Sequence, residues 1–135
     1  MEQLTDEERE TLVKHRLEKA KETLIDAKEI AKIKRWRVVA NRLYYACFYA
    51  VSALLTKNKF SARSHNGIFG LFGLHFVSKG LVSKEQNKLY RNLFDLRQTG
   101  DYDDFAIIDE SDIAPIIEPT EQLIETIENL INENN

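Results

Sequence analysis

The chain has 135 residues with a hydrophobic content of 43% and a charged content of 30%, the balance of a soluble globular domain. Its length predicts one domain over residues 1–135, and five Gly with two Pro leave little room for a turn-rich all-β fold. The single cysteine, Cys47, excludes an intrachain disulfide, and the acidic start of the chain does not resemble a signal peptide. We therefore expect a cytoplasmic protein.

The net charge of −3 conceals two poles of opposite sign. Residues 14–63 carry 13 Lys and Arg against 4 Asp and Glu, whereas residues 64–135 carry 5 against 13. Such poles are consistent with the solvated outer faces of helices, with self-association, or with a basic face for a polyanion.

Two long helices are predicted in the first half of the chain. The capping box Thr5–Glu8 begins the first, and an apolar stripe continues it to about residue 33. The second, over about residues 35–56, is apolar on nearly all sides, which is typical of a helix buried by its neighbours. Its apolar run is long enough for a membrane span, but Asn41 and Arg42 interrupt it, so we expect a core helix.

A polar connection over residues 57–64 precedes a third predicted helix, which begins near Ser64 and stops at Gly80. The helix contains three glycines at three-residue spacing: Gly67, Gly70 and Gly73. Glycine in a helix costs roughly 1 kcal/mol relative to alanine. Three glycines on one face therefore predict that another backbone comes close.

A second capping box, Ser83–Gln86, begins a fourth helix that we expect to end at Arg97. An acidic loop is predicted over residues 98–110, followed by a last helix over residues 111–132. Pro119 should kink that helix or delay its start, whereas Pro115 fits its first turn. Five helices without a convincing strand predict an all-α, up-and-down bundle.

The segment Leu96–Phe105 is the strongest candidate for function, because it places an arginine, a tyrosine and three aspartates around a glycine at a predicted helix end. The aspartates do not fit an EF-hand, since Phe105 and Ala106 stand where an oxygen ligand and a glycine are required. The histidines and Cys47 lack the spacing of zinc ligands. We predict no metal site and no cofactor.

Two further polar residues invite a functional interpretation. His65 lies at the predicted start of the third helix in a polar segment, where it serves either a site or a hydrogen bond to a neighbouring loop. Arg42 falls inside the apolar helix and needs an anionic partner, either the acidic loop or a bound phosphate. Lys and Arg around Trp36 raise the same possibility of nucleic-acid contact.

Three segments taken in order resemble the HEPN domains, the small helical domains named for higher eukaryotes and prokaryotes nucleotide-binding. The helix Ala40–Leu55 looks like the signature helix of the family, and Ser64–Gly80 looks like the following segment of one uncharacterised prokaryotic branch. Leu96–Tyr102 is similar to the Leu-Arg…Asp-Tyr motif of that branch. The resemblance covers about residues 8–132.

The resemblance implies a bundle of four or five helices that forms a homodimer. It also implies, for many members, metal-independent ribonuclease activity through an arginine followed four to six residues later by a histidine. Prokaryotic members often act as toxins or defence effectors and are frequently paired with a nucleotidyltransferase antitoxin. The family arginine maps onto Arg97 and the polar residue after it onto Gln98.

The chain departs from that motif at one position, because Tyr102 stands where the histidine is expected. Tyrosine has a reference pKa of about 10 and is a weak base at neutral pH. Loss of a general base typically lowers a rate by about 10² to 10⁴. His65 would replace the missing base only if the fold brings it to Arg97.

Three hypotheses follow for the function. The leading one is a HEPN module of a prokaryotic toxin–antitoxin or defence system that binds nucleotide or RNA, or docks onto a nucleotidyltransferase partner, through Arg97, Gln98, Arg42, Tyr45 and Asp101. The alternative is a metal-independent endoribonuclease with a degenerate motif, whose catalytic residues are Arg97, Tyr102 and His65. The third is a structural interaction domain in which the acidic loop ties Arg42 and Arg97 together.

Overall fold

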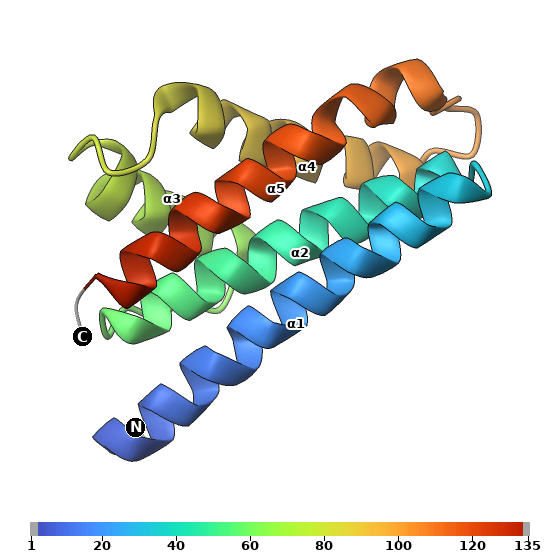
Figure 1. Cartoon of the computed structure of the whole chain (residues 1–135). Helices are drawn as coiled ribbons and strands as arrows, with labels where there is room; N and C mark the ends of the chain where they lie inside the picture. Colours follow the sequence, from blue (N-terminus) through green and yellow to red (C-terminus); the bar gives the residue numbers. More distant parts are fainter. Residues whose placement is uncertain (1–2, 134–135) are drawn as a thin grey trace.

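The computed structural model describes residues 3–133, which form helices and connecting segments without any strand. In chain order the elements are α1 (Asp6–Lys32), α2 (Trp36–Lys57), α3 (His65–Phe72), the π-helix η1 (Gly73–Val77), α4 (Lys84–Tyr102) and α5 (Glu110–Asn132). The long helices run roughly alongside one another, with the short α3 and η1 segment at one side (Figure 1). The predicted all-α bundle is confirmed.

Helix α2 is the centre of the bundle, since α1, α3, α4 and α5 all pack against it. Its side chains are buried along most of its length, and Cys47 has no exposed surface. By length and composition α2 would be able to cross a membrane, but 67% of its most apolar 18-residue stretch is buried inside the fold. The prediction of a buried core helix is confirmed.

Both predicted capping boxes are present. The Thr5 hydroxyl accepts from the Glu8 amide at 3.1 Å, and the Glu8 carboxylate accepts from the Thr5 amide at 2.8 Å. Ser83 and Gln86 form the same reciprocal pair at the start of α4. These contacts satisfy amide groups that a helix leaves without an internal acceptor, which explains why both helices begin where the sequence predicts.

The predicted end of the fourth helix at Arg97 is wrong. Helix α4 continues to Tyr102, so the connection to α5 covers only residues 103–109. The Arg37 guanidinium, on α2, donates to the carbonyl of Gly100 at 2.5 Å and to that of Ala106. These long-range hydrogen bonds stabilise the last turn of α4 and offset the unfavourable helix propensity of glycine.

Two smaller expectations are also corrected. Helix α5 is continuous from Glu110 to Asn132 and contains both prolines, so Pro119 does not delay its start. Within residues 3–133, a Cβ added at Gly70 or Gly73 would meet nothing within 4 Å, and one added at Gly67 would meet side-chain atoms, Ala62 Cβ and Ser64 Oγ, at 3.0 Å, so the expected close backbone is not found in this part of the chain. The predicted third helix is in fact α3 followed by the π-helix, which begins at Gly73.

Candidate functional site

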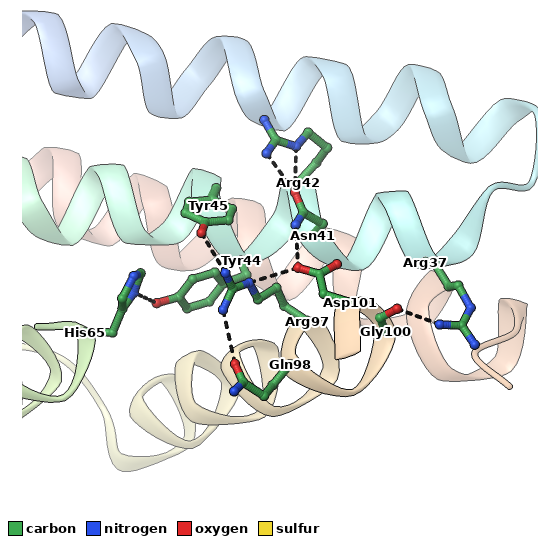
Figure 2. A network of polar contacts seen from close by, with 10 residues as sticks. All are labelled: Arg37, Asn41, Arg42, Tyr44, Tyr45, His65, Arg97, Gln98, Gly100 and Asp101. Carbon is green, nitrogen blue, oxygen red and sulfur yellow. Dashed lines mark hydrogen bonds and ion pairs between the residues drawn. The ribbon is translucent and has the colours of Figure 1, made fainter. Parts of the chain in front are cut away.

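Arg97 lies on the inner side of α4 and is held by three contacts (Figure 2). Its Nη2 donates to the Tyr45 hydroxyl at 2.9 Å, and its Nη1 donates to the Gln98 side chain at 3.1 Å. Its Nε lies 3.2 Å from the Asp101 carboxylate, an ion pair without the alignment of a hydrogen bond. Helical spacing places Asp101 one turn after Arg97, so the guanidinium has a fixed orientation.

Asn41 connects the two arginines that the sequence singles out. Its amide nitrogen donates to Asp101 at 3.0 Å, and its amide oxygen accepts from the Nε and Nη2 of Arg42 at 3.0 and 2.7 Å. Arg42 therefore reaches Asp101 only through Asn41. Among the described residues it forms no ion pair with the acidic segment, so of the two partners considered for Arg42 the acidic segment is reached indirectly, and a bound phosphate stays a prediction.

Two guanidinium groups lie close to the Tyr45 ring. The Cζ atom of Arg42 is 5.5 Å from the ring centroid, and that of Arg97 is 5.3 Å from it. Cation–π attraction of this kind favours the charged side chains over the ring face. The network thus contains two guanidinium groups and one carboxylate, Asp101, which pairs with Arg97, so it keeps a net positive charge.

His65 is the first residue of α3, and its ring packs at a tilt against that of Phe48 with a centroid distance of 4.6 Å. Its Nδ1 is hydrogen-bonded to the hydroxyl of Tyr44, a core residue of α2 (Figure 2). Burial lowers the pKa of His65 from its ordinary value of 6.5, and the nearby charge of Arg97 lowers it further. The imidazole is therefore neutral at physiological pH.

An open groove of about 490 Å³ brings these elements together. Its lining consists of polar and aromatic side chains from the start of α3 and the end of α4: Ser64, His65, Asn66, Phe94, Arg97, Gln98 and Tyr102. The three residues proposed as catalytic, Arg97, Tyr102 and His65, all line this groove. Arg42, Tyr45 and Asp101 are not among the lining residues, and two of them, Tyr45 and Asp101, contact Arg97.

The first amides of α3 add partial positive charge to this groove. Ser64 caps the helix by accepting from the Gly67 amide at 2.9 Å. The first amides of a helix otherwise have no internal acceptor, and they carry partial positive charge. Together with the Arg97 guanidinium, they make the groove suited to an anion.

Two residues of the site escaped the sequence analysis. Asn41 was noticed only as an interruption of an apolar run, although a polar pair inside a buried helix signals an internal network. Tyr44 is 1% exposed, and an apolar helix gives no sign that its hydroxyl reaches a histidine 21 positions later. No group of three or more His, Cys, Asp or Glu side chains able to hold a metal ion occurs among the described residues.

The fold and the groove define a small all-α module with an arginine of its penultimate helix exposed to a polar groove. The HEPN domain model matches residues 13–130, and the chain belongs to the HEPN domain family. The resemblance proposed from the three sequence segments is confirmed.

The chain is similar to several curated proteins. It is 37% identical to a UPF0332 protein of Thermotoga maritima over 93% of this chain and 96% of the relative. It is 29% identical to a Methanocaldococcus jannaschii protein named "putative toxin" over 87% of each chain. A second M. jannaschii protein of the same name is 28% identical over 64% of this chain and 59% of the relative. The chain is thus a HEPN module similar to proteins named as toxins.

Proposed function

We propose that this HEPN module serves in a prokaryotic toxin–antitoxin or defence system and that its groove binds a phosphate group of RNA or of a nucleotide. One observation carries the proposal: the Arg97 guanidinium and the His65 imidazole, from two different helices, line the same open groove. A guanidinium with a fixed orientation is well suited to phosphate oxygens. The names of the relatives support the toxin part of the proposal.

Each residue of the groove has a separate role in the proposed binding of a phosphate. Arg97 supplies the donors, with Tyr45 and Asp101 fixing its plane. The Nη1 of Arg97 donates to the exposed side chain of Gln98, and a phosphate oxygen can replace that side chain as the acceptor. Tyr102 is 68% exposed and lines the groove, where a base or a sugar can stack on its ring.

Fluorescence anisotropy with a fluorescein-labelled, mixed-sequence, single-stranded oligoribonucleotide tests the proposal. We expect Arg97→Ala to weaken binding at least roughly tenfold, because it removes the charged donor of the groove. Lys88→Ala is the matched control, since Lys88 is an exposed cation of the same helix and does not line the groove. Equal losses in the two variants would reject the groove as the binding site.

A second candidate function is metal-independent RNA cleavage, and the position of His65 favours it. The sequence left open whether this histidine reaches Arg97, and the structure places both in one groove. The test is an RNA cleavage assay in EDTA with the wild type, Arg97→Ala, His65→Ala and Tyr102→Phe. Cleavage that both alanine variants lose would support this candidate, and RNA binding without cleavage would reject it.

The docking part of the proposal concerns the connection after α4. Phe105 is 94% exposed and Ile107 is 86% exposed, beside the acidic residues Asp103 and Asp104. Exposed apolar side chains on a connection anchored by Arg37 are typical of a contact surface. A homodimer and a nucleotidyltransferase antitoxin are the partners we propose.

Light scattering gives the first test of the docking part. The chain has a mass of 15.7 kDa, so a homodimer has twice that mass. We expect the wild type to form the dimer at micromolar concentration. A wild type that stays monomeric would reject the homodimer. The second test co-expresses the chain with a nucleotidyltransferase from the same genome. If the nucleotidyltransferase co-purifies with the wild type and not with a variant that carries Phe105→Ser and Ile107→Ser, it is supported as the partner.

A further inference from the structure

We infer that Tyr44 is a positioning residue for His65: its hydroxyl donates to Nδ1 and so fixes the imidazole as the tautomer that carries its proton on Nε2. His65 then offers the ligand an N–H donor instead of a lone pair. The inference rests on the proposed function only for the identity of the ligand, a phosphate group.

The packing around the Tyr44 ring fixes the direction in which its hydroxyl points. The residue is 1% exposed, and its ring is surrounded by those of Phe48, Tyr90 and Phe94 at centroid distances of 6.0, 6.1 and 5.6 Å. Rings packed on several sides cannot swing to another rotamer without disturbing the core. The hydroxyl consequently stays at the base of α3, against His65 Nδ1.

The proton of that hydroxyl decides the tautomer. A neutral imidazole has one N–H and one lone pair, and a buried hydroxyl needs an acceptor for its own proton. The Tyr44 hydroxyl has two hydrogen-bond partners within residues 3–133, His65 Nδ1 and the hydroxyl of the buried Tyr90. If Nδ1 carried the proton and donated it, the Tyr44 proton would have only the Tyr90 oxygen as acceptor, and the proton of Tyr90 would be left buried without an acceptor among these groups. The arrangement that satisfies all three groups has Tyr90 donating to Tyr44, Tyr44 donating to Nδ1, and the imidazole proton on Nε2.

In the groove, this tautomer gives a hydrogen-bond donor, the Nε2–H of His65, in addition to the Arg97 guanidinium. His65 and Arg97 line it together, and burial with the charge of Arg97 favours the neutral imidazole. An Nε2–H group can donate to a phosphate oxygen that Arg97 also contacts. The same group has no lone pair with which to take a proton from a ribose hydroxyl. The Tyr44–His65 pair therefore favours binding over general-base cleavage.

The first experiment reads the tautomer directly, without any ligand. Two-bond ¹H–¹⁵N correlation spectra of the histidine rings in the free wild-type protein should give His65 the pattern of an Nε2–H tautomer. In Tyr44→Phe the ¹⁵N resonance of Nδ1 should move toward that of an unbonded ring nitrogen. Tyr49→Phe removes the same hydroxyl elsewhere on α2 and should leave His65 unchanged. An Nδ1–H pattern in the wild type, or an unmoved resonance in Tyr44→Phe, would overturn the inference.

The second experiment changes His65 and keeps the core intact, in case Tyr44→Phe fails to fold. Glutamine retains an N–H donor at a similar reach but cannot act as a base. We expect His65→Gln to hold the labelled oligoribonucleotide within roughly threefold of the wild type and His65→Ala to lose roughly tenfold. Equal losses would overturn the donor role. If no version of the protein binds the oligoribonucleotide, the proposed function fails, while the spectra of the wild type still decide the tautomer.

Discussion

The Nη2 of Arg97 donates to the Tyr45 hydroxyl across 2.9 Å and thereby joins α4 to the central helix α2. The guanidinium groups of both Arg42 and Arg97 also lie within 5.5 Å of the centroid of the Tyr45 ring. The arginine most important for the proposed site is thus oriented largely by a neutral side chain. A neutral partner orients a guanidinium without cancelling the charge that a phosphate needs.

The variant Tyr45→Phe tests that relationship. It keeps the ring and removes the hydroxyl, so Arg97 loses one fixed contact. We expect the free energy of unfolding to fall by about 1–2 kcal/mol, as for a hydrogen bond to a charged group, and RNA affinity to fall roughly threefold. Urea denaturation and fluorescence anisotropy measure the two effects. Tyr49→Phe, on the same helix, should change neither.

The variant Asp101→Asn examines the carboxylate between the two arginines. The amide still accepts from Asn41 and no longer neutralises Arg97. Because a partly exposed ion pair contributes little, we expect stability to change by less than about 1 kcal/mol. Affinity for the oligoribonucleotide should rise roughly threefold as repulsion of the phosphate disappears, most clearly at low salt. Asp95→Asn on the same helix controls for net charge, and weaker binding by Asp101→Asn would mean that the carboxylate acts on the orientation of Arg97 more than on the charge of the groove.

The pH dependence of stability should contain a contribution from His65. Its pKa in the folded chain lies below the ordinary value of 6.5, so below that pH the unfolded chain binds more protons than the folded one. The neutral imidazole therefore contributes to the free energy of unfolding above pH 6.5, and this contribution is lost as the pH falls through and below that value. We expect wild-type stability to fall more than that of His65→Gln between pH 7.5 and about pH 5.

Chemical denaturation of both proteins at matched pH provides the comparison. The pKa of the Glu8 carboxyl is lowered because it accepts a hydrogen bond from the Thr5 amide, and that of Asp109 because it accepts one from the Ser111 hydroxyl, so both remain ionised over this range. They do not confound the difference. Parallel pH profiles for wild type and His65→Gln would show that His65 does not titrate differently on folding.

The sequence predicts most of this fold because its signals are local. Capping boxes, apolar stripes and the all-round apolar helix identify the long helices, and each rests on residues only a few positions apart. The end of α4 was mistaken because the hydrogen bonds that continue it past Gly100 come from Arg37, 63 residues away. No local pattern announces such a contact.

The candidate site shows the same division. Arg97 and His65 stand out by residue type and by their places near helix ends, and the groove joins them. The bridge through Asn41 and the bond from Tyr44 to His65 depend on the rotation of α2 relative to α3 and α4. That rotation is decided by the packing of the whole bundle, so residue types alone do not reveal it.

Cys47 should be unreactive in the native protein. It has no exposed surface, and burial raises the pKa of its thiol far above the ordinary value, so the nucleophilic thiolate is scarce. We expect a thiol reagent such as iodoacetamide to label the chain only after unfolding in urea. Mass spectrometry of native and unfolded samples at the same pH measures the labelling. Rapid native labelling would mean that α2 opens readily from the core.

The variant Arg37→Ala tests how firmly the connection between α4 and α5 is held. The guanidinium donates to the carbonyls of Gly100 and Ala106, and without it the last turn of α4 loses its long-range support. We expect a loss of about 1–3 kcal/mol in the free energy of unfolding and faster proteolysis after Phe105, whose side chain is already exposed. Limited chymotrypsin digestion measures the second effect, and Arg35→Ala, an exposed arginine that precedes α2, is the control. An unchanged digestion rate would mean that the connection keeps its shape without Arg37, and the docking surface around Phe105 would then not depend on this arginine.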